Sequence, residues 1–364
     1  MSKPRLIAFY LPQFYPTKEN DEWWQKGFTE WTNVGNAKPL FCGHYQPRVP
    51  ADLGYYDLRV PEVREEQAQL AREAGIEGFC YWHYWFAGRR LLDRVFSEVV
   101  ESGKPDFPFC LCWANHSWYQ KTWDPTKPDK LLIEQTYPGK QDYIDHFNAM
   151  LPAFKDKRYL KVNGKLIFGV FDAVGITKEQ FHEFSTIWNK LATENGLGGF
   201  HFFGFTYEVK KYDEILDKGF DSVVADYLRQ LQLKSGIIQR VFKRINRIAF
   251  GLPEHVNAYK DYVEFVLQNF DVSKKLYPCI LPNFDHSPRS KNRGGILHKS
   301  TPSLWEKFCL QMFKKCSSRK ENQNILFIKA WNEWGEGNYL EPDLKYKKGY
   351  ISALRRALDN FSNY

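Results

Sequence analysis

The sequence lacks several features that would have placed it in a class at once. Its 364 residues contain no run of about 18 uninterrupted apolar residues, the length that a membrane span needs. The mean hydropathy is −0.54, and residues 1–14 carry no apolar stretch typical of a signal peptide. These absences exclude an integral membrane protein and predict a cytoplasmic one.

Paired cysteines and strong charge are missing as well. The chain has seven cysteines, an odd number, and no C-x-x-C pair. Cys110 and Cys112 alternate along an apolar run, where cysteine behaves as a small hydrophobic residue. The pattern predicts free thiols in a reducing compartment. The net charge of +8 is mild for this length, so we expect no nucleic-acid partner.

Motifs for nucleotides and metals are also absent. There is no G-x-G-x-x-G, no Walker loop and no Asp-x-Asp, the pair of carboxylates with which many sugar transferases hold a metal and a diphosphate. His83, His116 and His286 could form a metal site, but none has H-x-x-x-H or H-E-x-x-H spacing. Hydrogen bonding to sugar hydroxyls or to carboxylates is the favoured interpretation of these histidines. We therefore expect no cofactor and no metal.

Short apolar runs recur along the chain, with amphipathic stretches between them. The eight runs are residues 6–10, 76–81, 109–113, 166–171, 200–205, 222–226, 277–281 and 325–331. Helical spacing predicts helices over residues 63–74, 91–100, 143–154, 178–194, 259–270, 304–315 and 350–358. Strands that are apolar throughout indicate a buried parallel sheet, and eight of them close a (β/α)8 TIM barrel. A doubly wound open sheet is the alternative, but its usual Gly-rich phosphate loop is missing.

No linker rich in Pro, Gly or Ser divides the chain, which predicts one α/β domain over residues 1–364 with extended βα loops. Insertions fall at about 12–57 and 227–258. Residues 238–248, in the second insertion, form a basic amphipathic helical pattern. Such a helix can lie on an anionic membrane surface or contact a lipid-linked glycan, but a helix that covers the barrel with its charges solvated is the favoured interpretation.

Aromatic residues are abundant, at 17% of the chain, and many follow the predicted strands. In a TIM barrel the carboxyl ends of the strands carry the active site. Aromatic faces beside amide, His and carboxylate groups suit a polyhydroxylated ring. The candidate substrate-binding residues at these ends are Tyr10, Gln13, Tyr81, His83, Trp85, Trp113, Asn115, His116, Trp118, Tyr207, Asp285, Arg289, Trp331, Asn332 and Trp334. Glu30, in the first insertion, is a further candidate.

The segment after the eighth run is the most informative. Glu333 and Glu336 are three residues apart, between two tryptophans and two glycines. Side chains at i and i+3 are neighbours on a helical turn, about 5–6 Å apart at Cβ. Two carboxyl groups about 5–5.5 Å apart suit glycoside cleavage with retention, and wider pairs suit inversion. Close carboxylates also separate their pKa values, so that one stays protonated while the other is ionised. We therefore predict that both glutamates are catalytic.

At this segment the sequence resembles a known family. WNEWGEG at 331–337, followed by NYLEPD at 338–343, resembles the WbsX-type proteins of surface-polysaccharide gene clusters, which are related to glycoside hydrolase family 99. YLPQF at 10–14, GFTEWTN at 27–33, GFCYWHYWF at 78–86 and DHSPR at 285–289 extend the resemblance along nearly the whole chain. It adds Trp31, Asn338, Tyr339 and Glu341 to the candidate substrate-binding residues.

The resemblance implies a (β/α)8 barrel and a retaining mechanism. Glu333 would act as a base on the substrate's own 2-hydroxyl, giving a 1,2-anhydro sugar, and Glu336 would be the acid that protonates the leaving oxygen. The sequence departs from the related endo-α-mannosidases at Gly335, where they usually carry a larger residue. A glycosidase acting on an oligosaccharide or surface polysaccharide is the first hypothesis, and a glycosyltransferase of surface-glycan synthesis is the alternative. A carbohydrate-binding module would explain the aromatic residues but not the paired glutamates.

Overall fold

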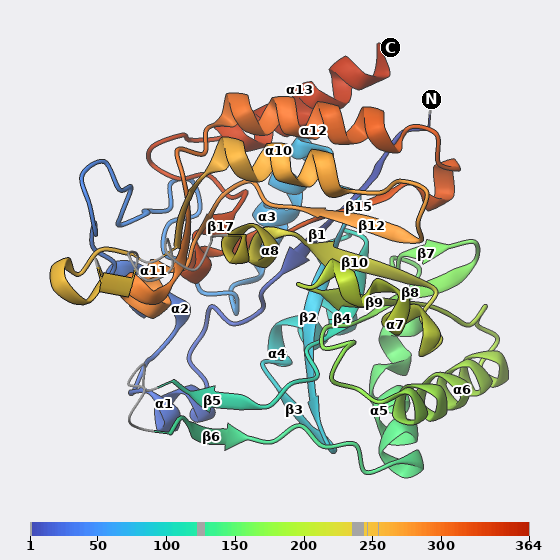
Figure 1. The fold of residues 1–364 in the computed structure, drawn as a ribbon. Helices are drawn as coiled ribbons and strands as arrows, with labels where there is room; N and C mark the ends of the chain where they lie inside the picture. Colours follow the sequence, from blue (N-terminus) through green and yellow to red (C-terminus); the bar gives the residue numbers. More distant parts are fainter. Residues whose placement is uncertain (1, 122–127, 235–243, 246, 254, 364) are drawn as a thin grey trace.

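The computed structural model describes residues 2–121, 128–234, 244–245, 247–253 and 255–363. Eight parallel strands pair in the order β1-β15-β12-β10-β9-β8-β4-β2, and β2 pairs with β1 to close the barrel (Figure 1). These strands are β1 Arg5–Tyr10, β2 Gly78–Phe86, β4 Phe109–Trp113, β8 Lys165–Val170, β9 Phe200–Thr206, β10 Ser222–Asp226, β12 Leu276–Ile280 and β15 Ile325–Ile328. The predicted TIM barrel is confirmed.

Helices surround the barrel, and α10, α12 and α13 pack against one another along one side (Figure 1). The helices are α3 Pro61–Ala74, α4 Arg94–Ser102, α5 Lys140–Phe154, α6 Lys178–Glu194, α7 Tyr212–Asp217, α8 Leu228–Leu233, α10 Tyr259–Asn269, α12 Pro302–Cys316 and α13 Gly349–Ser362. Each of the seven predicted helices has a counterpart here. Within the described residues, no helix has the length and apolar character to cross a membrane.

Local sequence explains where these helices begin and end. The Thr177 side chain accepts a hydrogen bond from the Gln180 backbone N–H, and the Gln180 side chain accepts one from the Thr177 N–H, so a capping box starts α6. Gly75 ends α3 in the left-handed conformation at φ 84°, which costs glycine little because it has no Cβ. The buried stripe of α6, which includes Phe184 and Trp188, faces the sheet.

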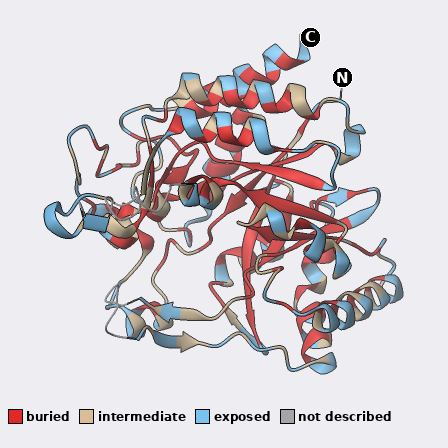
Figure 2. Ribbon diagram, viewed as in Figure 1, coloured by how far each residue is buried: buried red, intermediate tan, exposed pale blue. Residues whose placement is uncertain are grey.

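Aromatic rings fill the interior of the barrel. Phe9 of β1 stacks on Trp82 of β2 at 4.5 Å between centroids, and Phe327 of β15 contacts Phe9 at 5.3 Å and Phe203 at 4.9 Å. In Figure 2 the strands are buried along their length, whereas the surrounding helices alternate between buried and exposed residues. Much of the aromatic surplus is therefore packing.

Shorter elements build the loops around the barrel strands, and most of them lie at the carboxyl ends. The first insertion holds α1 Lys18–Trp23 and α2 Glu30–Gly35, and a hairpin after β4 holds β5 Trp118–Gln120 and β6 Lys130–Ile133. The others are β3 Arg89–Leu91, β7 Lys161–Val162, β11 His255–Ala258, β13 Phe284–Asp285, α11 Ser287–Ser290, β14 Gly295–His298, β16 Asn332–Glu333 and β17 Asn338–Tyr339, with 3₁₀ turns η1 Val209–Lys211, η2 Lys291–Arg293, η3 Glu321–Gln323 and η4 Trp334–Glu336. The predicted amphipathic helix at 238–248 lies largely outside the described residues.

Candidate active site

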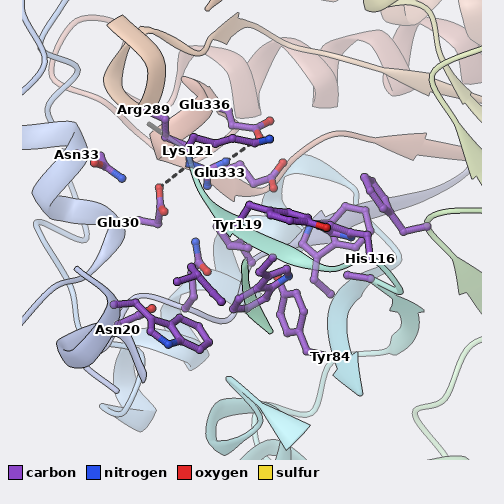
Figure 3. Close-up of a pocket in the computed structure, with 18 of the residues that line it drawn as sticks. Asn20, Glu30, Asn33, Tyr84, His116, Tyr119, Lys121, Arg289, Glu333 and Glu336 are labelled. Carbon is purple, nitrogen blue, oxygen red and sulfur yellow. Dashed lines mark hydrogen bonds and ion pairs between the residues drawn. The ribbon is translucent and has the colours of Figure 1, made fainter. Parts of the chain in front are cut away.

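A pocket of about 630 Å³ opens at the carboxyl ends of the barrel strands. Its lining combines the ends of β2 and β15 with the loops after β1, β4, β9 and β12. Figure 3 shows Glu30, Arg289, Glu333 and Glu336 gathered on one side of this pocket. The placement is the one that the barrel prediction requires for an active site.

A tight hairpin presents the two glutamates. The strands β16 and β17 pair antiparallel, with Glu333 opposite Asn338, and the 3₁₀ turn η4 between them ends at Glu336. Gly337 follows with φ 51°, the left-handed conformation that closes the turn. Both Glu333 and Glu336 line the pocket, so the E-x-x-E spacing brings two carboxyl groups into one cavity.

Buried hydrogen bonds fix this hairpin from behind. Asn332 Oδ1 accepts from the Leu11 N–H at 2.7 Å, which ties β16 to the end of β1. Glu341 accepts from Trp334 Nε1 at 2.6 Å, from Gln67 Nε2 at 2.6 Å and from the Tyr56 hydroxyl at 2.9 Å. A network with satisfied donors and acceptors holds its members in one arrangement, so it fixes the orientation of the two glutamates.

Two cations contact Glu336, the partly buried Arg289 and the buried Lys329. Arg289, on α11, donates from Nη1 to Glu336 Oε1 at 2.7 Å and from Nε to Glu30 Oε2 at 3.0 Å. Lys329 Nζ lies 3.4 Å from Glu336 Oε2 and 3.7 Å from Asp226 Oδ2, and it donates to the Tyr207 hydroxyl at 3.2 Å. We call Glu30, Arg289, Lys329, Glu333 and Glu336 the charged wall of the pocket.

The charged wall gives its two central glutamates opposite proton affinities. Burial, followed by the nearby charge of Glu336, raises the pKa of Glu333 to about 7. Burial alone would raise the pKa of Glu336 too, but the charges of Lys329 and Arg289 outweigh it and lower this pKa to about 2. Between these two pKa values the pair therefore shares a single proton, as an acid–base pair requires.

Aromatic side chains form the facing part of the pocket. Trp118, on β5, contacts Tyr84 at 5.1 Å and Trp23 at 5.9 Å between ring centroids, and all three line the pocket. We call Trp23, Tyr84 and Trp118 the aromatic wall. Trp24, Phe28 and Tyr119 add further rings to the lining, and Tyr84 and Tyr119 are labelled in Figure 3. Ring faces beside a polar cluster are the combination that suits a sugar.

The sequence-predicted residues divide into two groups. The group that lines the pocket is Gln13, Glu30, His116, Trp118, Tyr207, Arg289, Glu333 and Glu336. The group that lies elsewhere is Tyr10, Trp31, Tyr81, His83, Trp85, Trp113, Asn115, Asp285, Trp331, Asn332, Trp334, Asn338, Tyr339 and Glu341. Substrate contact by any member of either group stays a prediction.

The orientation of strand β2 explains three members of the second group. Successive side chains of a strand point to opposite faces. Tyr81, His83 and Trp85 point away from the barrel interior, toward α4 and α5, where Tyr81 packs on Phe96, and His83 Nε2 lies 2.8 Å from His146 Nε2. Trp82 and Tyr84 face the pocket instead. Trp113 is likewise fully buried outside the barrel interior, against Phe184 at 5.6 Å, and does not line the pocket.

Other members of that group brace the site. Tyr10 donates to Gln67 Oε1 at 2.7 Å, and Trp31 Nε1 donates to the Tyr56 carbonyl at 2.7 Å. Asn115 Oδ1 accepts from the Asp172 N–H at 2.7 Å. Trp331 and Asn338 are fully buried. The Asn115 contact links the loop after β4 to the loop after β8, whereas the Tyr10 contact ties β1 to α3 and the Trp31 contact joins two parts of the first insertion.

Asp285 and Tyr339 belong to a second cavity of about 280 Å³, on the other side of the hairpin from the glutamates. Asp285 Oδ2 lies 2.7 Å from His44 Nε2 and accepts from Gln46 Nε2 at 2.7 Å, and the Tyr339 hydroxyl donates to Asp343 Oδ2 at 2.7 Å. Asp285 forms no ion pair with Arg289 among the described residues, where Arg289 pairs with Glu30 and Glu336.

The sequence interpretation missed several pocket residues, chiefly Lys329, Trp82, Tyr84 and Trp23. Residues opposite each other in a sheet share a face, and Phe9 lies opposite Cys80. Because side chains alternate along a strand, Trp82 points to the same face as Cys80, and alternation would therefore have identified it.

Within the described residues, no group of three His, Cys, Asp or Glu side chains is arranged to hold a metal ion.

The fold and the site place the protein in one structural class, the closed (β/α)8 barrels with a carboxylate pair at the carboxyl-terminal rim. Residues 6–354 match the family model described as "Glycosyltransferase WbsX". The chain therefore belongs to the WbsX family of glycan-acting enzymes, and the predicted resemblance is confirmed.

Relatives and solved structures agree with this placement. The chain is 34% identical over 356 residues to the uncharacterized protein WxcX of Xanthomonas campestris pv. campestris strain B100, matching 97% of this chain but 49% of WxcX. It thus spans about half the length of that relative. A GH99 endo-alpha-mannosidase from Bacteroides thetaiotaomicron has a similar fold, with a TM-score of 0.63, 13% identity and coverage of 100% of this chain and 98% of that one. A glycoside hydrolase-like protein matches with a TM-score of 0.60, 14% identity and coverage of 98% and 94%.

Proposed function

We propose that this chain cleaves a glycosidic bond in an oligosaccharide or surface polysaccharide with retention, using Glu333 and Glu336. The observation that carries the proposal is the pair of carboxyl groups that line one pocket, of which Glu333 has its pKa raised to about 7 and Glu336 has its pKa lowered to about 2. One proton on two carboxyl groups is what glycoside cleavage by acid–base catalysis uses.

The proposed reaction proceeds in two half-steps. Glu333 takes the proton of the substrate's 2-hydroxyl as O2 attacks the anomeric carbon, and Glu336 gives its proton to the departing oxygen as that bond breaks. Glu336 then removes a proton from the attacking water, the C1–O2 bond of the 1,2-anhydro sugar opens, and Glu333 returns its proton to O2. Side chains supply every proton, so the reaction needs neither a nucleotide nor a metal.

The charge distribution bears on these roles in two ways. With its pKa near 2, a protonated Glu336 is a strong donor, and with its pKa near 7 Glu333 is a strong acceptor, which favours proton transfer in the assigned direction. The same values make ionised Glu336 with protonated Glu333 the dominant resting state of the pair. That resting state is the one from which the second half-step begins.

A glycosyltransferase is the second candidate, and the description of the family model favours it. The chemistry differs in one respect: a sugar hydroxyl, rather than water, attacks C1 in the second half-step, and Glu336 removes its proton. The aromatic wall would then hold the acceptor sugar. Contact of residues 238–248 with a membrane or a lipid-linked glycan belongs to the same proposal.

Leaving-group dependence tests the assignment. The substrates are an α-mannosyl oligosaccharide, chosen because the structural neighbour is an endo-alpha-mannosidase, and the fluoride of its non-reducing portion. Glu336→Gln should lower the rate on the oligosaccharide about 10²- to 10⁴-fold and spare the fluoride, which departs without a proton. Glu333→Gln should slow both, because attack by O2 is needed whatever leaves.

Two outcomes would contradict the proposal. If the fluoride rescues Glu333→Gln rather than Glu336→Gln, the roles are exchanged. If both variants keep wild-type rates on both substrates, the glutamates are not catalytic. Adding acceptor sugars and measuring the ratio of transfer to hydrolysis separates the transferase from the glycosidase.

A further inference from the structure

Lys329 occupies an unusual place for a lysine. It directly follows β15 at the base of the pocket, and its side chain is 4% exposed. Its ammonium group faces Glu336 Oε2 at 3.4 Å, Asp226 Oδ2 at 3.7 Å and the Tyr207 hydroxyl at 3.2 Å. A buried ammonium is costly unless it is paired and hydrogen-bonded. These three partners, from β10, η4 and the end of β9, are therefore what keeps it charged.

We propose that Lys329 is a positioning residue that keeps Glu336 ionised and so directs the single shared proton of the glutamate pair to Glu333. The inference rests on the proposed function, since it assigns a role within the same acid–base pair.

The contact pattern carries this inference. Four carboxyl groups surround the site, those of Glu30, Asp226, Glu333 and Glu336, but Arg289 and Lys329 supply two permanent positive charges. Arg289 bridges Glu30 and Glu336, and Lys329 bridges Asp226 and Glu336. Within the described residues, Glu336 is thus the carboxylate that both cations contact.

Glu333 has the opposite surroundings. Its Oε2 is buried and has no hydrogen-bond partner in the described part of the protein, and neither cation forms an ion pair with it there. A buried carboxyl without partners favours its neutral form. The proton shared by the pair therefore belongs on Glu333, and its high pKa, with the low pKa of Glu336, agrees with this placement.

The remaining charged groups near Glu336 do not alter the argument. His286 Nε2, on the loop that leads into α11, lies 4.0 Å from Glu336 Oε1, and burial lowers the pKa of this histidine, so it is neutral near pH 7. Glu30, on α2, is neutralised by Arg289. Burial raises the pKa of Asp226, although Lys329 opposes this change. The Tyr207 hydroxyl is neutral, since burial raises its pKa.

Two variants that change the charge in opposite directions test the proposal. The measurement is the pH dependence of kcat/KM, in which the acidic and alkaline limbs report the pKa values of the catalytic groups in the free enzyme. Lys329→Met removes a positive charge, so both limbs should move to higher pH, by about one unit or more. Asp226→Asn removes a negative charge, so both limbs should move to lower pH. Lys329→Arg should restore the wild-type profile. Damage to the fold would lower the rate in both variants, but it would not move the limbs to higher pH in one variant and to lower pH in the other.

A measurement without substrate separates this inference from the proposed function. Infrared difference spectra between wild type and Glu336→Gln isolate the carboxylate band of Glu336 during a pH titration. The band should persist to about pH 3 in the wild type, and the Lys329→Met variant should lose it at higher pH. Suppose that cleavage depends on both glutamates, but that Lys329→Met and Asp226→Asn move neither the limbs of the kcat/KM profile nor the carboxylate band of Glu336. That result would overturn the role of Lys329 and leave the proposed function standing. If Lys329→Met does not fold, the comparison of Asp226→Asn with the wild type still tests the inference. An alkaline limb of the kcat/KM profile that does not move in Asp226→Asn would overturn it.

Discussion

The two walls of the pocket are built on different principles. In the charged wall, Arg289 contacts Glu30 at 3.0 Å and Glu336 at 2.7 Å, and Glu333 and Glu336 sit in a hairpin braced from behind. The aromatic wall consists of Trp23 on an insertion helix, Tyr84 on barrel strand β2 and Trp118 on a loop hairpin, with Trp118 only partly buried. Rigid ion pairs suit proton transfer at defined atoms, whereas ring faces suit binding that tolerates different sugars.

Removing the central cation of the charged wall should have the largest effect. Arg289→Met would leave Glu30 and Glu336 buried without their shared counter-charge, and breaking such a pair costs about 3–5 kcal/mol. We expect kcat to fall by at least about 100-fold, measured on the same oligosaccharide.

Lys121→Met is the matched control, because Lys121 lines the same pocket but its side chain is 53% exposed and pairs with Asp129 at 2.6 Å. Exposed ion pairs contribute little, so kcat should stay within a factor of about three of the wild type. Equal losses in the two variants would mean that general charge, rather than the buried contacts of Arg289, controls the rate.

The packing of Glu30 against the E-x-x-E turn gives the next prediction. A Cβ added at Gly335 would collide with Glu30 Oε2 and approach Arg289 Nε to 2.9 Å. Gly335→Ala should therefore displace the Glu30–Arg289 pair, with an overpacking cost of about 1–3 kcal/mol and a fall in kcat of roughly 5- to 150-fold.

The double variant Glu30→Gly with Gly335→Ala removes the collision and serves as the control. It should recover activity relative to Gly335→Ala if the steric conflict is the cause. An additive loss would show instead that Glu30 is needed in its own right, which would make it part of the binding site and not only a partner of Arg289.

The barrel could be predicted from the sequence because its strands are buried on both faces and read as apolar runs. The same property hid the orientation of β2. All nine of its residues, from Gly78 to Phe86, are buried, so no polar alternation separates the inward face from the outward one. The candidate residues on this strand were chosen one position out of phase, and Trp82 and Tyr84 were missed.

In the charged wall the sequence analysis missed only Lys329, and the reason is different. Glu333 and Glu336 are neighbours in sequence, so local spacing found them. Lys329 is defined by Asp226 and by the Tyr207 hydroxyl, which come from strands 100 residues or more away in the chain. A lysine at the end of an apolar run gives no sequence signal of burial, because its partners become neighbours only when the barrel closes. The aromatic residues of the first insertion, such as Trp23, follow no periodic pattern, so the sequence did not predict that they line the pocket.

The smallest effect should come from the aromatic wall. Trp118→Ala would remove a ring face from the pocket, and we expect a loss of about 1–2 kcal/mol in binding, which is roughly a 5- to 30-fold rise in KM with kcat nearly unchanged. Trp113→Ala is the contrasting variant, since this equally aromatic neighbour is fully buried and donates from Nε1 to the Trp85 carbonyl at 3.1 Å. It should lower the free energy of unfolding by about 3–5 kcal/mol and leave KM of the folded fraction unchanged. Chemical denaturation and steady-state kinetics on both variants check this. A KM effect from Trp113→Ala as large as that from Trp118→Ala would remove the distinction between a ring that binds and a ring that packs.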